Sequence, residues 1–279
     1  MERPDAPLRR RLIVNADDYG RSSSINTAVI QAHRDGILTT ASLMVTGDAA
    51  AEAVELARQN PRLGVGLHLT LLMGKAAMPP EQVPGLANAS GNFSDNPVKV
   101  GMNYFFKPEL EAQIEAEMDA QFALFRRTGL ELDHVNGHLH LHLHPVVFRL
   151  LMKHATRWGV RRIRLTRDAF WLNARIAGGE WLYRTSHAVI FHALSLWARG
   201  EVVKRGLKHT PWVFGLLQNG RVDEAYILKL LPELPPGDAE LFSHPGINEF
   251  PREAAALVSP AVKAAVQRLG IELIRYQDL

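Results

Sequence analysis

The stretch LIVNADDYG, residues 12–20, is an apolar run that ends in two carboxylates and a glycine. Residues 12–16 predict a short buried strand, and a helical pattern follows them, so the stretch predicts the opening of a βα unit. Two adjacent carboxylates at a strand end are costly unless cations or hydrogen bonds compensate. Asp17 and Asp18 are therefore the first functional signal, and Gly20 is suited to a turn that lets both serve one site. The plain structural alternative is a carboxylate that caps the next helix.

The alternation of short β-rich runs with longer helical patterns continues along the chain, which is typical of repeated βα units around a parallel sheet. The predicted strands are residues 12–16, 40–45, 64–69, 131–135, 162–165, 239–243 and 271–276. The predicted helices are residues 25–35, 49–59, 108–127, 146–158, 225–231 and 252–269. We therefore predict an α/β fold, a single-domain (β/α) barrel over residues 1–279 that is distorted or seven-stranded.

Two stretches interrupt this alternation. Residues 71–107 are rich in proline, glycine and asparagine, and residues 174–213 are rich in tryptophan and long aliphatic side chains. Long insertions in an α/β scaffold usually shape access to the substrate. We expect the same of these two.

Composition excludes several classes of protein. A chain of 279 residues that is 47% hydrophobic can bury a large core, and it contains no cysteine, which excludes thiolate catalysis, thiolate zinc sites and disulfides. The N-terminus lacks the long apolar run of a signal peptide, and no segment is apolar for long enough to span a bilayer. The net charge is only +3 and no nucleic-acid motif accompanies the arginines. We expect a cytoplasmic protein that does not bind nucleic acid.

Single histidines stand at the ends of two other predicted strands. GLHL at residues 66–69 places His68 between apolar residues, and SHPG at residues 243–246 places His244 before a turn. Taken alone, His68 is more simply a core histidine satisfied by a backbone carbonyl. The position of His244 suits a catalytic loop, and an exposed histidine in a strand-to-loop transition is an equal alternative.

The run HVNGHLHLHLHP, residues 134–145, is harder to explain as ordinary core. Strand periodicity would stack its imidazoles on one face and its leucines on the other. Alternate strand residues lie roughly 6.5–7 Å apart, whereas metal–nitrogen bonds are about 2.1 Å, so one ion cannot bind the whole row. We expect one or two of these histidines to bind a metal ion. The roles of His134, His140, His142 and His144 stay open.

Five of these side chains lie at the carboxyl ends of four predicted strands: Asp17, Asp18, His68, His138 and His244. Carboxyl ends of parallel barrel strands meet on one face. One aspartate and two histidines would make an open three-ligand metal site, and the other carboxylate and histidine would be free to transfer protons.

The motifs NADDYG, GLHL, the histidine run and SHPG, in this order over residues 12–276, resemble the YdjC-like carbohydrate deacetylases, relatives of the polysaccharide deacetylases. The arrangement is similar to the hopanoid-biosynthesis-associated branch of that family. The resemblance implies Asp18, His68 and His138 as metal ligands, Asp17 as general base and His244 as general acid. Family members often carry aspartate where this chain has Asn136, so a carboxylate role at that position is in doubt.

The expected reaction is metal-dependent removal of an N-acetyl group from an acetylated amino sugar, with one divalent ion: zinc, magnesium, manganese, cobalt or nickel. The resemblance implies an N-acetylglucosaminyl hopanoid glycolipid as substrate, with a chitooligosaccharide as the alternative. A metal-dependent phosphoesterase would need further carboxylates at strand ends. A non-catalytic sugar- or lipid-binding protein would not need Asp17 or His244. The chain has no G-x-S-x-G elbow for a serine hydrolase.

A lipid-linked substrate implies peripheral contact with the inner face of the membrane. The segment 181–208 combines bulky apolar residues with basic flanks, which fits an interfacial helix. Continuous apolar character also marks a buried helix that closes the barrel. The sequence does not fix the oligomeric state.

Overall fold

Parallel strands form one curled sheet in the computed structural model, which describes residues 9–279. The strands are β1 (Arg10–Tyr19), β2 (Thr40–Leu43), β3 (Gly64–Leu69), β4 (Val135–Gly137), β5 (Trp212–Phe214), β6 (Gly237–Ser243) and β7 (Glu272–Ile274). The order across the seven-stranded sheet is β4-β3-β2-β1-β6-β5, and β7 pairs with β1. The predicted α/β fold with a barrel-like parallel sheet is confirmed. The expectation about a signal peptide rests partly on residues 1–8, outside the described part.

The central strand β1 has three neighbours. It pairs with β6 from Arg10 to Ala16, with β7 near its start, and with β2 near its end. Its last eight residues are buried, as expected for a parallel strand covered on both faces. The strand therefore delivers its final side chains, which include both aspartates, into the interior.

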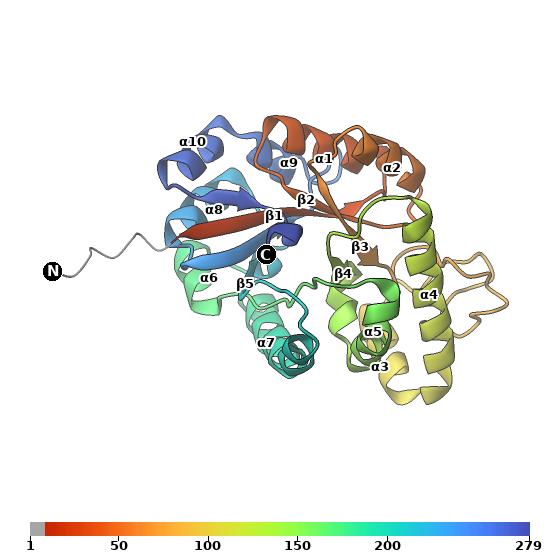
Figure 1. Ribbon diagram of the computed structural model, residues 1–279. Coiled ribbons are helices and arrows are strands. Elements are labelled where there is room, and N and C mark those ends of the chain that lie inside the picture. The colour runs from red at the N-terminus through yellow and green to blue at the C-terminus, as the bar shows by residue number, and fades with distance from the viewer. Residues whose placement is uncertain (1–8) are drawn as a thin grey trace.

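Helices surround this sheet (Figure 1). They are α1 (Ser23–Asp35), α2 (Ala50–Arg58), α3 (Pro97–Phe106), α4 (Glu111–Arg127), α5 (Pro145–Trp158), α6 (Phe170–Ile176), α7 (Trp181–Lys204), α8 (Glu224–Leu230), α9 (Pro251–Val258) and α10 (Pro260–Arg268). In the view of Figure 1, α1, α2, α9 and α10 lie above the sheet, whereas α3, α5 and α7 lie below it. Their apolar faces and the strands share one large buried core.

Two of the predicted strands were wrong in position. Residues 162–165 form only isolated bridges, from Ile163 to Val135 and from Arg162 to Lys208, and the strand next to β6 is instead β5, inside the second insertion. The strand expected at residues 131–135 begins at Val135 and ends at Gly137. Sequence periodicity did not locate the three-residue strands β4 and β5, whose positions depend on pairing with β3 and β6.

One predicted helix is two. The pattern at residues 252–269 breaks at Ser259, which is extended (ψ 127°), because the residue before a proline avoids helical geometry. The Ser259 side chain caps α10 by accepting hydrogen bonds from Ala261 and Val262. The other predicted helices are confirmed within a few residues of their ends.

Each insertion contains a helix with an exposed apolar face. In α7, Leu182 is 86% exposed and Val189 is 65% exposed. In α3, Val98, Phe105 and Phe106 are exposed. The α7 segment is therefore not a fully buried core helix. Within residues 9–279, every helix is too short or too polar to cross a membrane.

Candidate metal centre

The two aspartates leave β1 by a local break in its geometry. The register between β1 and β2 shifts between Ala16 and Tyr19, and Asp18 itself adopts a left-handed backbone (φ 63°) before Gly20 (φ 90°). Neighbouring side chains of a regular strand point to opposite faces, so this break is what lets both carboxylates serve one site. Both side chains are buried. The expected turn is present, but it begins at Asp18.

Asp18 lies against two imidazoles. Its Oδ1 atom is 2.8 Å from Nδ1 of His138 and 3.2 Å from Nε2 of His68. Each of the three residues offers one ligand atom, and these atoms lie within 4.8 Å of one another. The structure thus brings together the three residues expected to bind the metal ion.

Asp18 also holds a cation at its other oxygen. Oδ2 accepts a hydrogen bond of 2.9 Å from Arg21. Burial opposes ionisation of Asp18, but the charge and hydrogen bond of His138, together with the nearby His68 ring, lower its pKa well below the usual value. The carboxylate is therefore the charged member of the cluster.

The nitrogen of His68 that points away from Asp18, Nδ1, holds the ring in its orientation. Nδ1 lies 2.7 Å from Oδ1 of Asn136, whereas the buried Nε2 atom has no hydrogen-bond partner among the described residues. Burial lowers the pKa of His68, but Asp17 and Asp18 outweigh it and raise the pKa above its usual value. A ring that is held at one nitrogen and bare at the other is the usual state of a metal-ligating histidine.

Asp17 is held by donors on both oxygens. Oδ1 accepts from Asn15 at 2.8 Å, Asn136 at 2.9 Å and Arg164 at 3.0 Å, and Oδ2 accepts from Arg164 at 2.7 Å. Burial raises the pKa of Asp17, but the Arg164 guanidinium and the nearby histidines lower it far below the usual value. Asp17 therefore stays ionised at physiological pH.

Sequence reasoning missed Arg164. It is fully buried, and it also donates to Glu240 at 2.6 Å and stacks over the ring of Phe242 at 4.4 Å. Glu240 in turn accepts a short hydrogen bond from Tyr276. A glutamate in the apolar run of β6 and an arginine between Ile163 and Leu165 were the available signals, because buried charges of opposite sign are usually paired.

His244 lies at the edge of the same site. It follows β6 and is partly buried, and its ring is 5.9 Å from the ring of Phe242, the residue that stacks on Arg164. Its backbone N–H donates to Glu253 at 2.6 Å. Within residues 9–279, no hydrogen bond fixes its imidazole, so the ring is free to contact a bound molecule.

The expected row of strand histidines was wrong. The chain leaves β4 at His138 and continues as a 3-10 segment (His138–Leu143) in which Leu139 and His140 have positive φ angles. The imidazoles therefore diverge, and only His138 of this run reaches the metal-ligand cluster. The run was predicted as a strand because alternation of histidine and leucine has the period of a strand.

The other histidines of the run have separate partners. His134 bonds to Asp133 and Ser42, His142 bonds to the carbonyl of Arg164, and His144 caps α5. Burial lowers the pKa of His142 to about 3. These three residues serve the surrounding structure, whereas His140 packs between Phe191 and Phe242.

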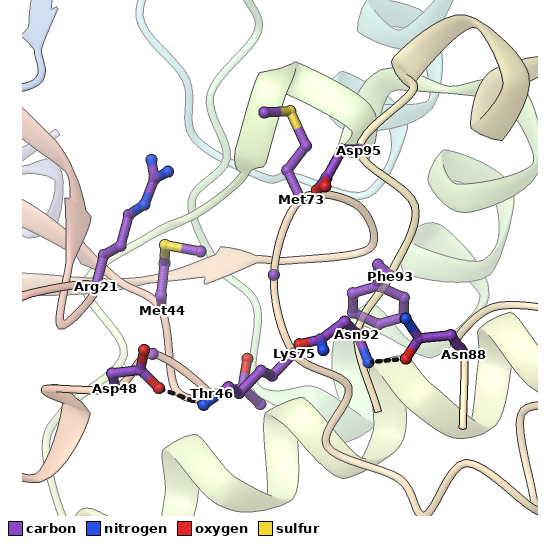
Figure 2. Close-up of a pocket in the computed structure, with 12 residues that line it drawn as sticks. Arg21, Met44, Thr46, Asp48, Met73, Lys75, Asn88, Asn92, Phe93 and Asp95 are labelled. Atoms are coloured by element: carbon purple, nitrogen blue, oxygen red, sulfur yellow. Dashed lines mark hydrogen bonds and ion pairs between the residues drawn. The ribbon is translucent and has the colours of Figure 1, made fainter. Parts of the chain in front are cut away.

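A polar cleft adjoins the cluster (Figure 2). Its volume is about 410 Å³, and Arg21, which bonds to Asp18, forms part of its wall. The rest of the lining combines charged and amide side chains with Met44, Met73 and Phe93. The wall therefore combines polar and apolar side chains.

An apolar cavity of about 720 Å³ lies between α6, α7 and β5. Phe170 and Ala188 line it and pack against a small buried cluster that includes Phe242. Phe242 also contacts Arg164, so the apolar cavity and the charged site are linked through this one ring.

Comparisons with known proteins agree with this arrangement. Residues 11–268 match the family model described as YdjC-like protein. The chain is 37% identical over 287 residues to a carbohydrate deacetylase of Geobacillus stearothermophilus, covering 97% of this chain and 98% of that one. It is 36% identical over 289 residues to a chitooligosaccharide deacetylase of Enterobacter sp. (strain 638), covering 98% of this chain and all of that one.

Other similarities are shorter or weaker. A carbohydrate deacetylase of Brevibacillus brevis is 38% identical over 150 residues, 54% of this chain, and the chain spans just over half (57%) of that relative. The crystal structure of a proposed cellobiose-phosphate cleavage protein from Enterococcus faecalis V583 superposes with a TM-score of 0.73 over 97% of this chain and 98% of that one. At 22% identity, this similarity concerns the fold alone.

Proposed function

The chain belongs to the YdjC-like family, and from that premise we propose that it is a metal-dependent hydrolase that removes the N-acetyl group from an acetylated amino sugar. The observation that carries the proposal is the cluster of Asp18, His68 and His138, with Asp17 and His244 beside it. The names of the full-length relatives, a carbohydrate deacetylase and a chitooligosaccharide deacetylase, support the reaction class.

The cluster fits a divalent metal ion. His68 presents a buried nitrogen without a partner, and an unpaired polar atom in the interior costs free energy that coordination would recover. One carboxylate and two imidazoles suit zinc, and also magnesium, manganese, cobalt or nickel with added waters. A bound ion would supply Lewis acidity toward the acetamide carbonyl and acidify a water molecule.

Asp17 acts as the general base in this proposal. Its carboxylate is ionised at physiological pH, so Oδ2 can accept a proton from the attacking water. Arg164 holds both oxygens in place while the proton is transferred. The strongly lowered pKa makes Asp17 a weaker base. The same contacts with Arg164 that lower the pKa also fix the orientation of the carboxylate.

His244 acts as the general acid. An amine leaves a tetrahedral intermediate readily only when its nitrogen has been protonated, so the reaction needs a proton donor on that side. The His244 ring has no hydrogen bond to another described residue and lies beside Phe242. The products are acetate and the free amino sugar.

We propose an N-acetylglucosaminyl hopanoid glycolipid as the substrate. The polar cleft beside Arg21 would accept the sugar, and the apolar cavity between α6 and α7 would accept part of the lipid. The exposed apolar side chains of α7, with Arg199, Lys204 and Arg205 near its end, support peripheral contact with an anionic membrane. A chitooligosaccharide is the alternative, favoured by the polar cleft and the name of the Enterobacter relative.

Mass spectrometry of candidate substrates tests the proposal. Purified protein is incubated with N-acetylglucosaminyl glycolipids or chitooligosaccharides, after chelation and after addition of each divalent ion. We expect loss of one acetyl group only when an ion is present. Equal loss with and without chelator contradicts metal dependence, and no loss from any acetylated sugar contradicts the deacetylase proposal.

A further inference from the structure

A chain of buried hydrogen bonds leads from Asp133 to His68. It runs from Asp133 to His134 (2.9 Å), from His134 to Ser42 (2.9 Å), from Ser42 to Asn136 (2.9 Å) and from Asn136 to His68 (2.7 Å). All five side chains are buried. Buried polar hydrogens are almost always donated to an acceptor of the protein. This requirement determines which atom donates in each of these hydrogen bonds.

The direction begins at Asp133. One of its carboxyl oxygens accepts from the backbone N–H of Gln277 at 3.1 Å, and the other contacts Nδ1 of His134. A carboxylate only accepts hydrogen bonds, so Nδ1 of His134 carries a hydrogen. The remaining question is the state of His134 Nε2.

The hydrogen bonds of Ser42 determine whether His134 Nε2 carries a hydrogen. The Ser42 oxygen already accepts from two amide groups, Nδ2 of Asn15 at 3.0 Å and Nδ2 of Asn136 at 2.9 Å. A hydroxyl has two acceptor positions and one hydrogen. The hydroxyl hydrogen therefore points to Nε2 of His134, which is an unprotonated acceptor, and not to the Asn15 oxygen at 3.4 Å.

The orientation of the Asn136 amide follows. Nδ2 donates one hydrogen to Ser42 and the other to Oδ1 of Asp17 at 2.9 Å. The reversed amide would turn its oxygen toward the Asp17 carboxylate and leave two acceptors in contact. Oδ1 of Asn136 therefore faces His68, and Nδ1 of His68 must supply the hydrogen.

We propose that Asn136 is a positioning residue which, with Ser42 and His134, keeps a hydrogen on Nδ1 of His68, so that the neutral form of the ring takes the tautomer with its hydrogen on Nδ1. Nε2 lies 3.2 Å from Oδ1 of Asp18, and two acceptor atoms in this position would be satisfied together by a metal ion bound between them. The tautomer itself is a property of the metal-free protein, and only its use rests on the proposed function. An amide is suited to this place because it accepts from His68 and donates to Asp17 at once.

Packing holds the chain of bonds in place. The His134 ring stacks on Tyr276 with centroids 4.4 Å apart. On the other side, a Cβ atom at Gly66 would lie 2.5 Å from this ring. The ring is thus confined between an aromatic side chain and a strand backbone, and it cannot flip to exchange its two nitrogens without moving one of them.

Nitrogen-15 NMR of histidine-labelled, metal-free protein at alkaline pH measures the tautomer of His68 directly. Zinc affinity is measured in parallel by competition with a chromophoric chelator. We compare Asn136→Ala with Asn15→Ala, because Asn15 contacts the same Asp17 and Ser42 atoms but not His68. Asn136→Ala should mix the His68 tautomers and weaken zinc binding about 10- to 100-fold, whereas Asn15→Ala should leave His68 unchanged.

Asn136→Asp separates the two functions of the amide. It retains an acceptor for His68, so the tautomer should persist, although the donors to Asp17 and Ser42 are lost. A wild-type His68 with its hydrogen on Nε2 overturns the proposal, even if no variant folds. Equal zinc affinities of Asn136→Ala and Asn15→Ala overturn it as well. Absence of deacetylation with the expected tautomer would contradict the proposed function alone.

Discussion

Arg164 binds both oxygens of the Asp17 carboxylate, Nη1 to Oδ2 at 2.7 Å and Nη2 to Oδ1 at 3.0 Å. Such a bidentate pair fixes the plane of the carboxylate as well as its position. Both partners are fully buried, so solvent does not screen the interaction. The orientation of the proposed base is therefore set by an arginine from a segment that is not a regular strand.

The first prediction concerns Asp17. Asp17→Asn should lower the rate of acetate release by about 10²- to 10⁴-fold, because the variant cannot accept a proton. Bound metal, measured by atomic emission after dialysis, should remain. The surface variant Asp119→Asn serves as a control that keeps full activity. An Asp17→Asn protein that folds and retains full activity would exclude Asp17 as the base.

The second prediction separates the histidines. His68→Ala or His138→Ala should weaken metal binding by more than about 100-fold, because each removes a ligand and not an orienting partner. His144→Ala should change metal affinity little, since His144 caps α5. His142→Ala should also retain the metal. Isothermal titration with zinc measures all four, and loss of metal in His142→Ala but not in His138→Ala would show that the cluster is wrongly assigned.

The third prediction tests His244 by the nature of the leaving group. His244→Gln should slow hydrolysis of an N-acetyl sugar about 100-fold or more, because the leaving amine needs a proton. The aryloxide group of an aryl acetate ester leaves as a stable anion without being protonated. The rate of hydrolysis of such an ester should therefore change little. Initial rates on the two substrates give the comparison. Equal slowing of both would mean that His244 has another role.

The fourth prediction concerns stability and pH. The pKa of His142 is about 3 in the folded protein and about 6.5 when unfolded, so the unfolded state binds more protons between these values. The contribution of His142 is thus complete above pH 6.5 and falls as the pH is lowered toward 3. From pH 7.5 to 5, His142 should account for about 2 kcal/mol of lost stability.

Urea unfolding of chelator-treated protein at the two pH values measures this effect. His142→Gln keeps a donor for the Arg164 carbonyl but does not titrate, so its free energy of unfolding should fall less with acidification than that of the wild type. Equal pH dependence of the two proteins would contradict the prediction.

The fifth prediction concerns the exposed face of α7. The purified protein should sediment with anionic liposomes, and the double variant Trp181→Ser, Trp197→Ser should sediment less, because both rings are half exposed. The control is zwitterionic liposomes, to which the basic flank should give little attraction. If the wild type fails to bind either vesicle, the lipid-linked substrate loses this support.

Much of the site could be predicted because side chains at the ends of parallel strands meet on one face. Asp17, Asp18 and His68 each follow a strand whose apolar run is plain in the sequence. His138 was named although its strand was misplaced, because it follows that strand and because the resemblance to a family selected it from the run. The resemblance to a family then assigned roles that spacing alone left open.

The parts that could not be predicted depend on contacts between distant segments. Arg164 belongs to a segment that the sequence presents as a strand, and its partners Asp17 and Glu240 are 147 and 76 residues away. The strand β5 likewise exists only through its pairing with β6, which is distant in the sequence. Local periodicity carries no information about which buried charge meets which, so these pairs appear only in the folded chain.

Gly66 has a consequence beyond packing. Its backbone needs no unusual geometry, and by conformation alone any residue could occupy the position. A single methyl group there would nevertheless displace the His134 ring, break its bond to Ser42 and release the Asn136 amide. Replacing one hydrogen atom of Gly66 by a methyl group would then change which nitrogen of His68 carries a hydrogen. The effect would pass through His134, Ser42 and Asn136. Screening for loss of metal binding should therefore recover changes at a glycine that touches no ligand.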